Sequence, residues 1–386
     1  MRITYIHQHY KAPGQPGGSR PREFARRLAR DGNEVTVIAA GSGPEFVDGY
    51  QVKWLPVSYN NSMGRARRIG AFFNFMVRAT LVASRLPADL VFASSTPLTV
   101  AVPGIVASKC QRSPFVFEVR DVWPELPIAL NSLPRPAIAP ARFLERRAYH
   151  SARDVIALSP GMKKSILATH PKASVHVIPN AADPDEYSEY RINRTAARRQ
   201  LGYSDDRPLV VYAGSIGRAY DPAWLAEFAI EANARNVQFV ALGHGAGLEK
   251  ARAACAAAGL DPSSVFLGAF PKTEAMQVVA AADWALSSLI AVDELEVNSL
   301  NKVFDAWGVG TPVLFNHGGW LAQIGETTGA GVRLPRDVRD VRWNDVFFEA
   351  TNREMQPRRD AALRLAQSRF DREKLYQVFR RVLLSA

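Results

Sequence analysis

Cysteine is scarce in this sequence. Cys110 and Cys255 are the only two among 386 residues, too few for the disulfide framework of a small secreted protein, and they lack the Cys and His spacing of a zinc site. The stretch MRITYIHQHY has no apolar run behind a basic region, so we expect no signal peptide. These absences predict a cytoplasmic protein.

Long hydrophobic runs are also missing. The stretch Leu90–Ser108 carries no charge over 19 residues, but Pro97 and Pro103 interrupt it. A strand, a turn and a short buried helix explain this stretch better than a transmembrane helix does.

Negative charge is in deficit, because 48 Lys and Arg residues face 37 Asp and Glu residues, a net charge of +11. This excess indicates an anionic partner, and composition alone leaves nucleic acid, a membrane surface and a phosphorylated substrate equally open. With 47% hydrophobic residues the chain has the composition of an ordered globular protein, and its length favours two domains.

Short β-rich apolar runs alternate with segments of helical period along the chain, which is the pattern of βαβ units. The sequence therefore predicts an α/β fold of two doubly wound, Rossmann-like domains. The division is expected within residues 179–184, where two prolines surround a turn, so the first domain is residues 1–182 and the second is residues 183–369. Ligands bind beyond the carboxyl ends of strands in such sheets, and we expect the two domains to face each other across a cleft.

Two glycine-rich loops follow predicted strands and open helices. Gly17 and Gly18 stand in the first loop, and Gly243 and Gly245 stand in the second. Glycines here let backbone N–H groups approach an anion at a helix N-terminus. Neither loop has the full GxGxxG or Walker A spacing, which disfavours a dinucleotide dehydrogenase or a P-loop NTPase. A plain turn is the alternative for both loops.

Two cations stand near expected strand ends or helix starts. Arg218 follows a predicted strand, and Lys302 lies near the start of a helix that Asn298 or Ser299 can cap. Asp305 follows Lys302 by three residues, on the same helix face. A cation for phosphate and a carboxylate for vicinal hydroxyls, one turn apart, suit a nucleoside diphosphate. A solvated arginine and a surface ion pair are the alternatives.

Arg120 and Asp121 form a further charged group, after a predicted strand and just before Trp123. They indicate a second set of ligand-facing side chains, although charges on a solvated loop are the alternative. Residues 183–185 match the DxD pattern of metal-dependent sugar transferases only formally, because they lie in the predicted linker. We therefore assign no metal.

The chain resembles the retaining glycosyltransferases of family 4, which have the GT-B fold, and in particular a bacterial surface-polysaccharide branch similar to L-fucosamine transferases. The landmarks, in order, are YIHQHYKAPGQPGGSRPREFARRLARDGNEVTVIAA, ASSTPLTVAVPG, FVFEVRDVWPEL, VIPNAAD, VYAGSIGRA, VALGHGAGLEK and NSLNKVFDAWGVGTPVL. The resemblance implies transfer of a sugar, with an N-acetylated hexose expected, from a UDP-sugar to a glycan or lipid-linked acceptor, without a cofactor.

The resemblance also implies a donor site. Its residues are Gly17, Gly18, Arg218, Gly243, Gly245, Asn298, Ser299, Leu300, Lys302 and Asp305. Arg218 and Lys302 would neutralise the diphosphate leaving group, the largest electrostatic task in the reaction. Asp305 stands where the family has a glutamate that binds the ribose hydroxyls.

For catalysis, the resemblance points to Arg120, Asp121 and Glu296. Val297 stands where the family has an acid near the donor sugar, so Glu296 or Glu294 is expected to supply that contact. Asp121 would orient the acceptor hydroxyl or stabilise an oxocarbenium-like sugar. Relatives pass the acceptor's proton to the departing phosphate, so no protein nucleophile is expected. Residues 370–386 resemble the last helix of the fold, which crosses back to the first domain.

Residues 65–78 join a basic cluster at 65–68 to aromatic residues over a helical length. A core helix with a solvated basic end accounts for this segment, and the alternative is peripheral docking on the anionic inner face of the plasma membrane. No RNA-type aromatic platform or helix-turn-helix signature is evident, so nucleic acid is not expected. Two other functions stay open, a UDP-sugar epimerase of the same fold and a non-catalytic nucleotide-sugar binder.

Overall fold

The computed structural model describes residues 1–13, 19–59, 63–192, 194–204, 206–349 and 355–385. The chain forms two compact units. The first comprises Met1–Pro179, Val297–Ser299 and Leu375–Ala386, and the second comprises Asn180–Glu296 and Leu300–Lys374. The division after Pro179 falls within the turn that the sequence marks, and the end of the chain belongs to the first unit.

The first unit is built on an eight-stranded sheet among its described residues, with the order β3-β4-β2-β1-β5-β6-β7-β8. The strands are β1 (Arg2–Ile6), β2 (Glu34–Ala40), β3 (Phe46–Val47), β4 (Tyr50–Leu55), β5 (Leu90–Ser94), β6 (Phe115–Val119), β7 (Asp154–Ala157) and β8 (Val175–Val177). All neighbours are parallel except the short β3 against β4. The helices are α1 (Arg20–Arg30), α2 (Arg65–Ala83), η1 (Leu98–Val100), α3 (Ala101–Gln111), α4 (Glu125–Ala129), α5 (Arg135–Ser151), α6 (Pro160–Thr169) and α17 (Arg372–Leu384).

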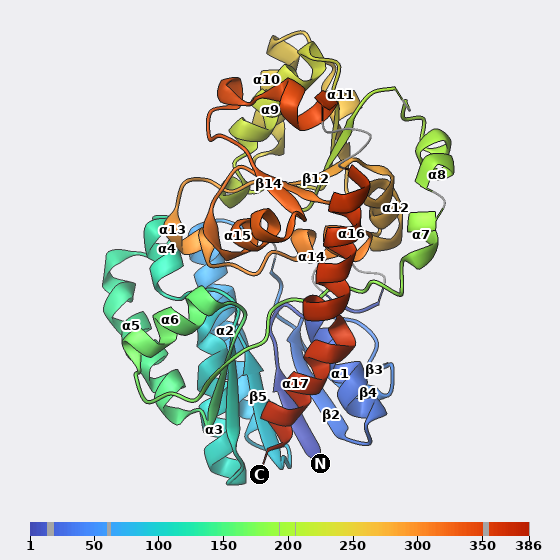
Figure 1. The fold of residues 1–386 in the computed structure, drawn as a ribbon. Helices are drawn as coiled ribbons and strands as arrows, with labels where there is room; N and C mark the ends of the chain where they lie inside the picture. Colours follow the sequence, from blue (N-terminus) through green and yellow to red (C-terminus); the bar gives the residue numbers. More distant parts are fainter. Residues whose placement is uncertain (14–18, 60–62, 193, 205, 350–354, 386) are drawn as a thin grey trace. The chain divides into compact units, whose positions relative to one another are not determined.

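Helices cover both faces of this sheet, so its strands are apolar on both sides. On one face, α17 lies beside α1 (Figure 1). The ring of Phe379 in α17 lies 4.4 Å from that of Phe24 in α1 and 5.3 Å from that of Phe92 in β5. On the other face, Phe75 of α2 and Ala93 of β5 belong to one buried cluster. The uncharged stretch that begins at Leu90 is a strand, a turn and a helix, as predicted; Pro97 stands at the N-cap of the 3-10 turn, and Pro103 lies in the first turn of α3.

The second unit has a six-stranded parallel sheet in its described part, with the order β11-β10-β9-β12-β13-β14. The strands are β9 (Leu209–Ala213), β10 (Gln238–Leu242), β11 (Phe266–Gly268), β12 (Trp284–Ser287), β13 (Val313–Phe315) and β14 (Gly331–Arg333). The helices are α7 (Ser188–Ile192), α8 (Arg194–Gln200), η2 (Arg218–Tyr220), α9 (Pro222–Ala234), α10 (Leu248–Ala257), α11 (Pro262–Val265), α12 (Lys272–Ala281), α13 (Asp293–Glu296), α14 (Asn301–Gly308), α15 (Gly319–Thr328), η3 (Val338–Asp340), η4 (Asp345–Glu349), α16 (Met355–Leu365) and η5 (Ala366–Phe370).

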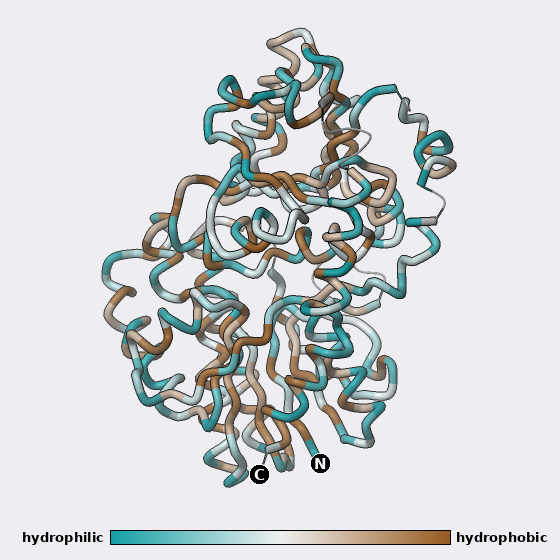
Figure 2. The backbone as a smooth tube through the Cα atoms, viewed as in Figure 1, coloured by the Kyte–Doolittle hydropathy of each residue, from teal (hydrophilic) through white to brown (hydrophobic). Residues whose placement is uncertain are grey.

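The predicted fold class is confirmed, since each unit is a parallel sheet with crossover helices. Apolar residues follow the strands of both sheets, and polar residues gather in the connecting loops and on outward helix faces (Figure 2). A stack of aromatic rings, Trp224 with Phe228 and Trp343 with Phe347, lies in the core of the second unit. No helix in the described ranges is long and apolar enough to cross a membrane.

Helix α2 is apolar on two sides. Ala71, Phe75 and Ala79 are buried in the core. On its outer side four apolar residues at a spacing of four are 41% to 62% exposed, and they are Ile69, Phe73, Val77 and Leu81. The core-helix interpretation therefore explains only the inner side of this segment.

Candidate functional site

Lys302 lies in the first turn of α14, beside the carboxyl end of β9. Its Nζ donates a hydrogen bond to Tyr212 Oη at 2.6 Å and lies 3.8 Å from the centre of the Tyr212 ring. The ring of Tyr220 in η2 is 4.3 Å away on another side. The Tyr212 hydroxyl in turn donates to the Ser215 carbonyl at 2.5 Å. We call Lys302, Tyr212 and Tyr220 the Lys302 cluster, and among the described residues it offers the ammonium no carboxylate partner.

The surroundings of Lys302 suit the binding of an anion. Burial lowers the pKa of Lys302 well below its usual value, because the ammonium loses water and gains only a hydroxyl and two ring faces in return. The lysine also passes close to Gly214, where a Cβ would lie 3.0 Å from Lys302 Cε. A phosphate beside Nζ would supply the missing negative charge.

The loops after β9 and β10 hold each other by backbone contacts. Ile216 N donates to His244 O at 2.9 Å, and Gly247 N donates to Ile216 O at 2.9 Å. A Cβ on Gly243 would lie 1.8 Å from Gly214 O, and one on Gly245 would lie 2.4 Å from the Ile216 carbonyl. Close packing of two loops thus accounts for these glycines without any ligand, while their predicted donor contacts stay a prediction.

Arg218 begins η2 and is exposed. In the described part of the chain its guanidinium makes no hydrogen bond or ion pair. It belongs to the same strand-end loop as Ser215, whose carbonyl the Tyr212 hydroxyl holds. Arg218 is therefore a second cation at this sheet edge that is available to an anion.

The predicted cap of α14 was wrong. The helix begins at Asn301 with Leu300 as its N-cap, and no side chain caps it, because residues Val297–Ser299 belong to the first unit. Asn298 and Ser299 therefore stand before the cap position, and the first amides of α14 lack the expected side-chain partner.

Lys302 and Asp305 share a helix but not a partner. Asp305 Oδ1 lies 3.1 Å from Lys272 Nζ of α12, whereas Lys302 extends to Tyr212. The expected alternative of a surface ion pair between the two is therefore wrong. Lys272 also approaches Asp183 Oδ2 at 3.8 Å, and Asp305 keeps a partly exposed carboxylate.

Glu296 ends α13 and holds a neighbouring loop. Its Oε1 accepts a hydrogen bond from Gly318 N at 3.0 Å, and a Cβ on Gly319 would lie 2.3 Å from the Glu296 carbonyl oxygen. Val297 next to it packs on the core of the first unit against Gly161, where a Cβ would lie 2.6 Å from Val297 Cγ1. Glu296 is thus fixed beside the start of α15.

Buried polar side chains support the ends of β12 and β13, and sequence reasoning missed them. His317 Nδ1 donates to Gly318 O at 2.8 Å, so Nε2 accepts from Ser287 Oγ at 2.9 Å. Burial lowers the pKa of His317 to about 4. Asn316 bridges the same loops through Leu289 N at 2.8 Å and Ser288 Oγ at 3.0 Å. The available signal was two adjacent polar residues at each strand end, Ser287 and Ser288 for β12 and Asn316 and His317 for β13.

In the first unit, polar residues gather at the carboxyl ends of three adjacent strands, β1, β5 and β6. We call His7, Ser95, Thr96, Arg120 and Asp121 the His7 cluster. Thr96 Oγ1 donates to Asp121 Oδ2 at 2.5 Å, and Arg120 N donates to Ser95 Oγ at 3.0 Å. The structure thus brings the predicted residues Arg120 and Asp121 together with His7, which the sequence did not single out.

His7 is held neutral. Arg120 Nη1 can only donate, so His7 Nε2 accepts at 3.3 Å, and Nδ1 then donates to Ser94 O at 3.0 Å. Burial, followed by the Arg120 charge, lowers the pKa of His7 well below its usual value. The same two causes lower the pKa of His9 to about 4. The side chain of Gln8 between them is buried, and no hydrogen bond within the described residues satisfies it.

A buried ion pair lies beneath this cluster. Arg20 donates to Glu118 Oε1 through Nε at 3.0 Å and Nη2 at 2.8 Å, and Ser94 Oγ donates to Glu118 Oε2 at 2.6 Å. Arg20 also donates to the carbonyls of Ile178 and Pro179. This network ties the start of α1 to the ends of β5, β6 and β8.

The remaining predictions concern glycines and metal. Gly17 and Gly18 lie outside the described residues. Asp183 of the DxD pattern is paired with Arg372, and no group of three metal-ligating side chains occurs within the described ranges.

Two parallel α/β units with polar strand-end loops define the GT-B class of fold. Residues 19–186 match the profile of Glycosyltransferase Family 4. No curated protein sequence matches the chain significantly.

Solved structures share the fold over the whole chain. Anabaena HepE in complex with UDP and glucose is 19% identical with a TM-score of 0.74, and 100% of each chain is covered. Sucrose-phosphate synthase from Thermosynechococcus elongatus is 16% identical with a TM-score of 0.73 and the same coverage. WaaG, a glycosyltransferase involved in lipopolysaccharide biosynthesis, is 17% identical with a TM-score of 0.70, again at full coverage. The profile match thus covers less than half of the chain, whereas the solved structures share the fold of the whole chain.

Proposed function

We propose that this protein is a retaining glycosyltransferase that moves a sugar, an N-acetylated hexose, from a UDP-sugar to a glycan or lipid-linked acceptor of a surface polysaccharide. The Lys302 cluster carries this proposal. A half-buried ammonium at the start of a helix, with no carboxylate partner among the described residues, suits a diphosphate leaving group.

The reaction needs charge neutralisation more than a nucleophile. The bond between the sugar C1 and the diphosphate oxygen breaks, the acceptor oxygen bonds to C1, and the acceptor's proton passes to the departing phosphate oxygen. Lys302, the exposed Arg218 and the amides at the start of α14, which no side chain caps, would stabilise the charge that develops on the diphosphate.

Uridine diphosphate is the donor carrier that the comparisons favour. Anabaena HepE has been solved with UDP and with UDP-glucose, and a trehalose-6-phosphate protein of the same fold from E. coli has been solved with UDP-2-fluoro glucose. In this chain we assign the ribose hydroxyls to the partly exposed carboxylate of Asp305, and the transferred sugar to Glu296.

We assign the acceptor to the His7 cluster. Asp121 Oδ2 accepts from Thr96, which leaves its other carboxylate oxygen for an acceptor hydroxyl or a developing positive charge on the sugar. Arg120 is oriented by its hydrogen bond to His7 and supplies the positive charge of this cluster. Gly17 and Gly18 keep their proposed role beside the pyrophosphate.

The test is UDP release from a panel of UDP-sugars, with and without glycans and polyprenyl-diphosphate-linked sugars as acceptors. The proposal predicts that UDP appears in quantity only when donor and acceptor are both present, and that NMR shows the donor's anomeric configuration in the product. A converted UDP-sugar without any acceptor would indicate an epimerase. Binding without turnover over the whole panel would indicate a non-catalytic binder.

We also propose that α2 docks on an anionic membrane surface. Its exposed apolar stripe (Ile69, Phe73, Val77 and Leu81) has the spacing of one helix side, and the neighbouring arginines are Arg67, Arg68 and Arg78. Apolar burial at the interface and about 1 kcal/mol for each basic residue near anionic lipid would act together.

Sedimentation with phosphatidylglycerol vesicles tests the docking. Phe73→Asp combined with Leu81→Asp is expected to abolish pelleting, and Arg67→Glu combined with Arg68→Glu to weaken it strongly. Phe46→Asp, the same change at another exposed aromatic of the first unit, is the matched control. Pelleting of both double variants to the same extent as the parent protein and Phe46→Asp would refute the docking.

A further inference from the structure

A group of arginines lies at the amino-terminal edge of the second unit's sheet, opposite the strand-end loops. Asp283 directly precedes β12, and its Oδ2 accepts from the backbone N of Leu209 at the start of β9, at 2.8 Å. Around this carboxylate stand Arg194 and Arg198 of α8 and Arg359 of α16. None of these residues belongs to the proposed donor site.

One carboxylate serves three guanidinium groups. Arg198 Nη1 lies 2.8 Å from Asp283 Oδ2, and Arg194 donates to Oδ1. Arg359 Nη2 lies 3.7 Å from Oδ1 and donates to the Ala282 carbonyl at 2.6 Å. The charges therefore sum to an excess of two positive charges around Asp283.

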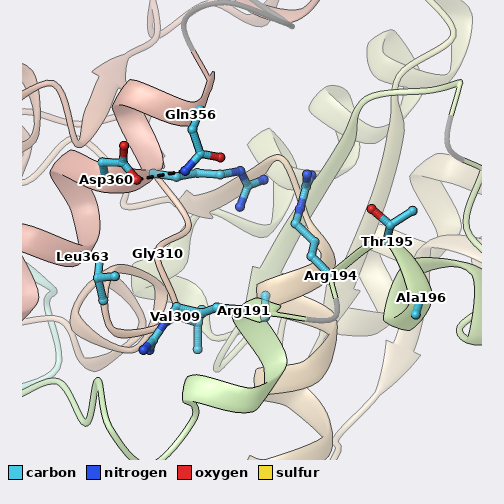
Figure 3. Close-up of a pocket in the computed structure, with 11 residues that line it drawn as sticks. Arg191, Arg194, Thr195, Ala196, Val309, Gly310, Gln356, Asp360 and Leu363 are labelled. Atoms are coloured by element: carbon cyan, nitrogen blue, oxygen red, sulfur yellow. Dashed lines mark hydrogen bonds between the residues drawn. The ribbon is translucent and has the colours of Figure 1, made fainter.

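Arg194 and Arg359 line a cavity. Its volume is about 580 Å³, within the range of small-molecule sites. The charged lining residues are Arg191, Arg194, Arg359 and Asp360, and apolar atoms of Val309 and Leu363 complete the wall. Figure 3 shows Arg194 extending from α8 into the space before α16, where Gln356 donates to Asp360 at 2.8 Å.

The polar groups of this cavity are not fully satisfied. Arg194 Nε is buried and has no hydrogen-bond acceptor among the described residues. Burial, reinforced by the charge of Arg194, lowers the pKa of Arg359 to about 9. Both observations indicate missing negative charge, because a guanidinium next to an anion would be favoured in its charged form.

We propose that this arginine cavity binds a small soluble molecule that carries a phosphate or diphosphate group, at a site separate from the sugar donor. Guanidinium groups bind phosphate oxygens through paired hydrogen bonds, and a dianion matches the excess of two charges. Val309 and Leu363 would contact the rest of the molecule.

Isothermal titration with inorganic pyrophosphate tests this site, with UDP present at saturation and ionic strength held constant by chloride. Parent protein is expected to bind one pyrophosphate under these conditions. Arg194→Gln and Arg359→Gln are each expected to weaken it by about tenfold or more. Arg339→Gln, at an arginine whose side chain is 81% exposed in the same unit, is expected to bind as parent does.

A second pair of variants leaves the Asp283 contacts intact, in case the arginine variants fail to fold. Thr195→Glu adds a negative charge at the exposed cavity rim and is expected to weaken pyrophosphate binding about tenfold, whereas Ala256→Glu, at an exposed position of α10, is not. Unchanged affinity in Thr195→Glu, or the loss of all binding when UDP is present, would overturn the proposal. Repeating the titration with Lys302→Met protein in the absence of UDP shows whether pyrophosphate binds to the arginine cavity independently of the donor site.

Discussion

The two strand-end clusters differ in how their charged groups are satisfied. In the His7 cluster every charged group has a protein partner, since Arg120 is held by His7 and Asp121 by Thr96. In the Lys302 cluster the ammonium has one tyrosine hydroxyl and two ring faces. The first is a preformed framework that orients groups, whereas the second is an incomplete cation site that an anion completes. This difference is the reason why we propose that the diphosphate binds to the second unit.

Loss of the buried Arg20–Glu118 ion pair beneath the His7 cluster is expected to have the largest effect on the stability of the protein. Arg20→Met leaves Glu118 buried without its cation, and breaking a buried ion pair costs about 3–5 kcal/mol of the free energy of unfolding. Urea denaturation measures this loss. Arg26→Met, at an exposed pair with Glu23, is the control and is expected to change stability by less than about 1 kcal/mol.

A double variant sharpens the same result. Adding Glu118→Gln to Arg20→Met removes the stranded charge, so part of the lost stability is expected to return. A double variant that is less stable than Arg20→Met would show that Glu118 has other partners that matter more than Arg20.

Asp121→Asn tests the functional side of the framework. Loss of the carboxylate charge is expected to lower kcat by about a hundredfold, while UDP affinity stays at the parent value. Steady-state kinetics with UDP titration separates the two effects. Asp89→Asn, which changes an exposed pair with Arg2 at the other edge of the sheet, is the control. A variant with parent kcat would exclude Asp121 from the reaction.

The smallest predicted effect concerns pH. His9 stays neutral in the folded protein down to its pKa of about 4, whereas an unfolded histidine takes up a proton near pH 6.5. Between these values the unfolded state binds more protons, so His9 makes stability fall as pH falls, by up to about 2 kcal/mol at pH 5.

Comparison with His9→Gln isolates this contribution. Glu145 acts in the opposite direction, because burial raises its pKa to about 7, but it is common to both proteins. The drop in unfolding free energy from pH 7 to pH 5 is expected to be smaller in His9→Gln than in parent protein. An equal drop in the two proteins would show that His9 does not contribute.

Sequence periodicity was sufficient to predict the fold and the positions of some residues in each site. Alternation of apolar runs and helical segments predicted both sheets, because local patterns determine which stretches become buried strands. The loop positions of Arg120 and Asp121 followed from the rule that parallel strands end at one edge, and the position of Lys302 followed from the predicted helix start. Their partners did not follow, because they come from distant residues. Tyr212 is far from Lys302 in sequence, and Lys272, which holds Asp305, lies on another helix.

The N-cap of α14 was predicted wrongly for the same reason, since it depends on residues that are distant in the sequence. Asn298 and Ser299 are favoured N-cap residues in a local pattern, but the first unit includes residues Val297–Ser299, and the helix begins after Leu300. Tertiary packing thus overrides a local preference at this helix start. The cavity beside Arg194 could not be predicted either, since it is lined by residues of α7, α8, α12 and α16 and by the two residues that follow α14.

The most direct test of the account compares UDP with uridine in titrations of parent protein, Lys302→Met and the exposed control Lys374→Met. If Lys302 binds the diphosphate, parent and control prefer UDP to uridine by about ten- to a hundredfold, and Lys302→Met loses that preference while still binding uridine. Undiminished preference for UDP in Lys302→Met would contradict the assignment of the diphosphate to the Lys302 cluster.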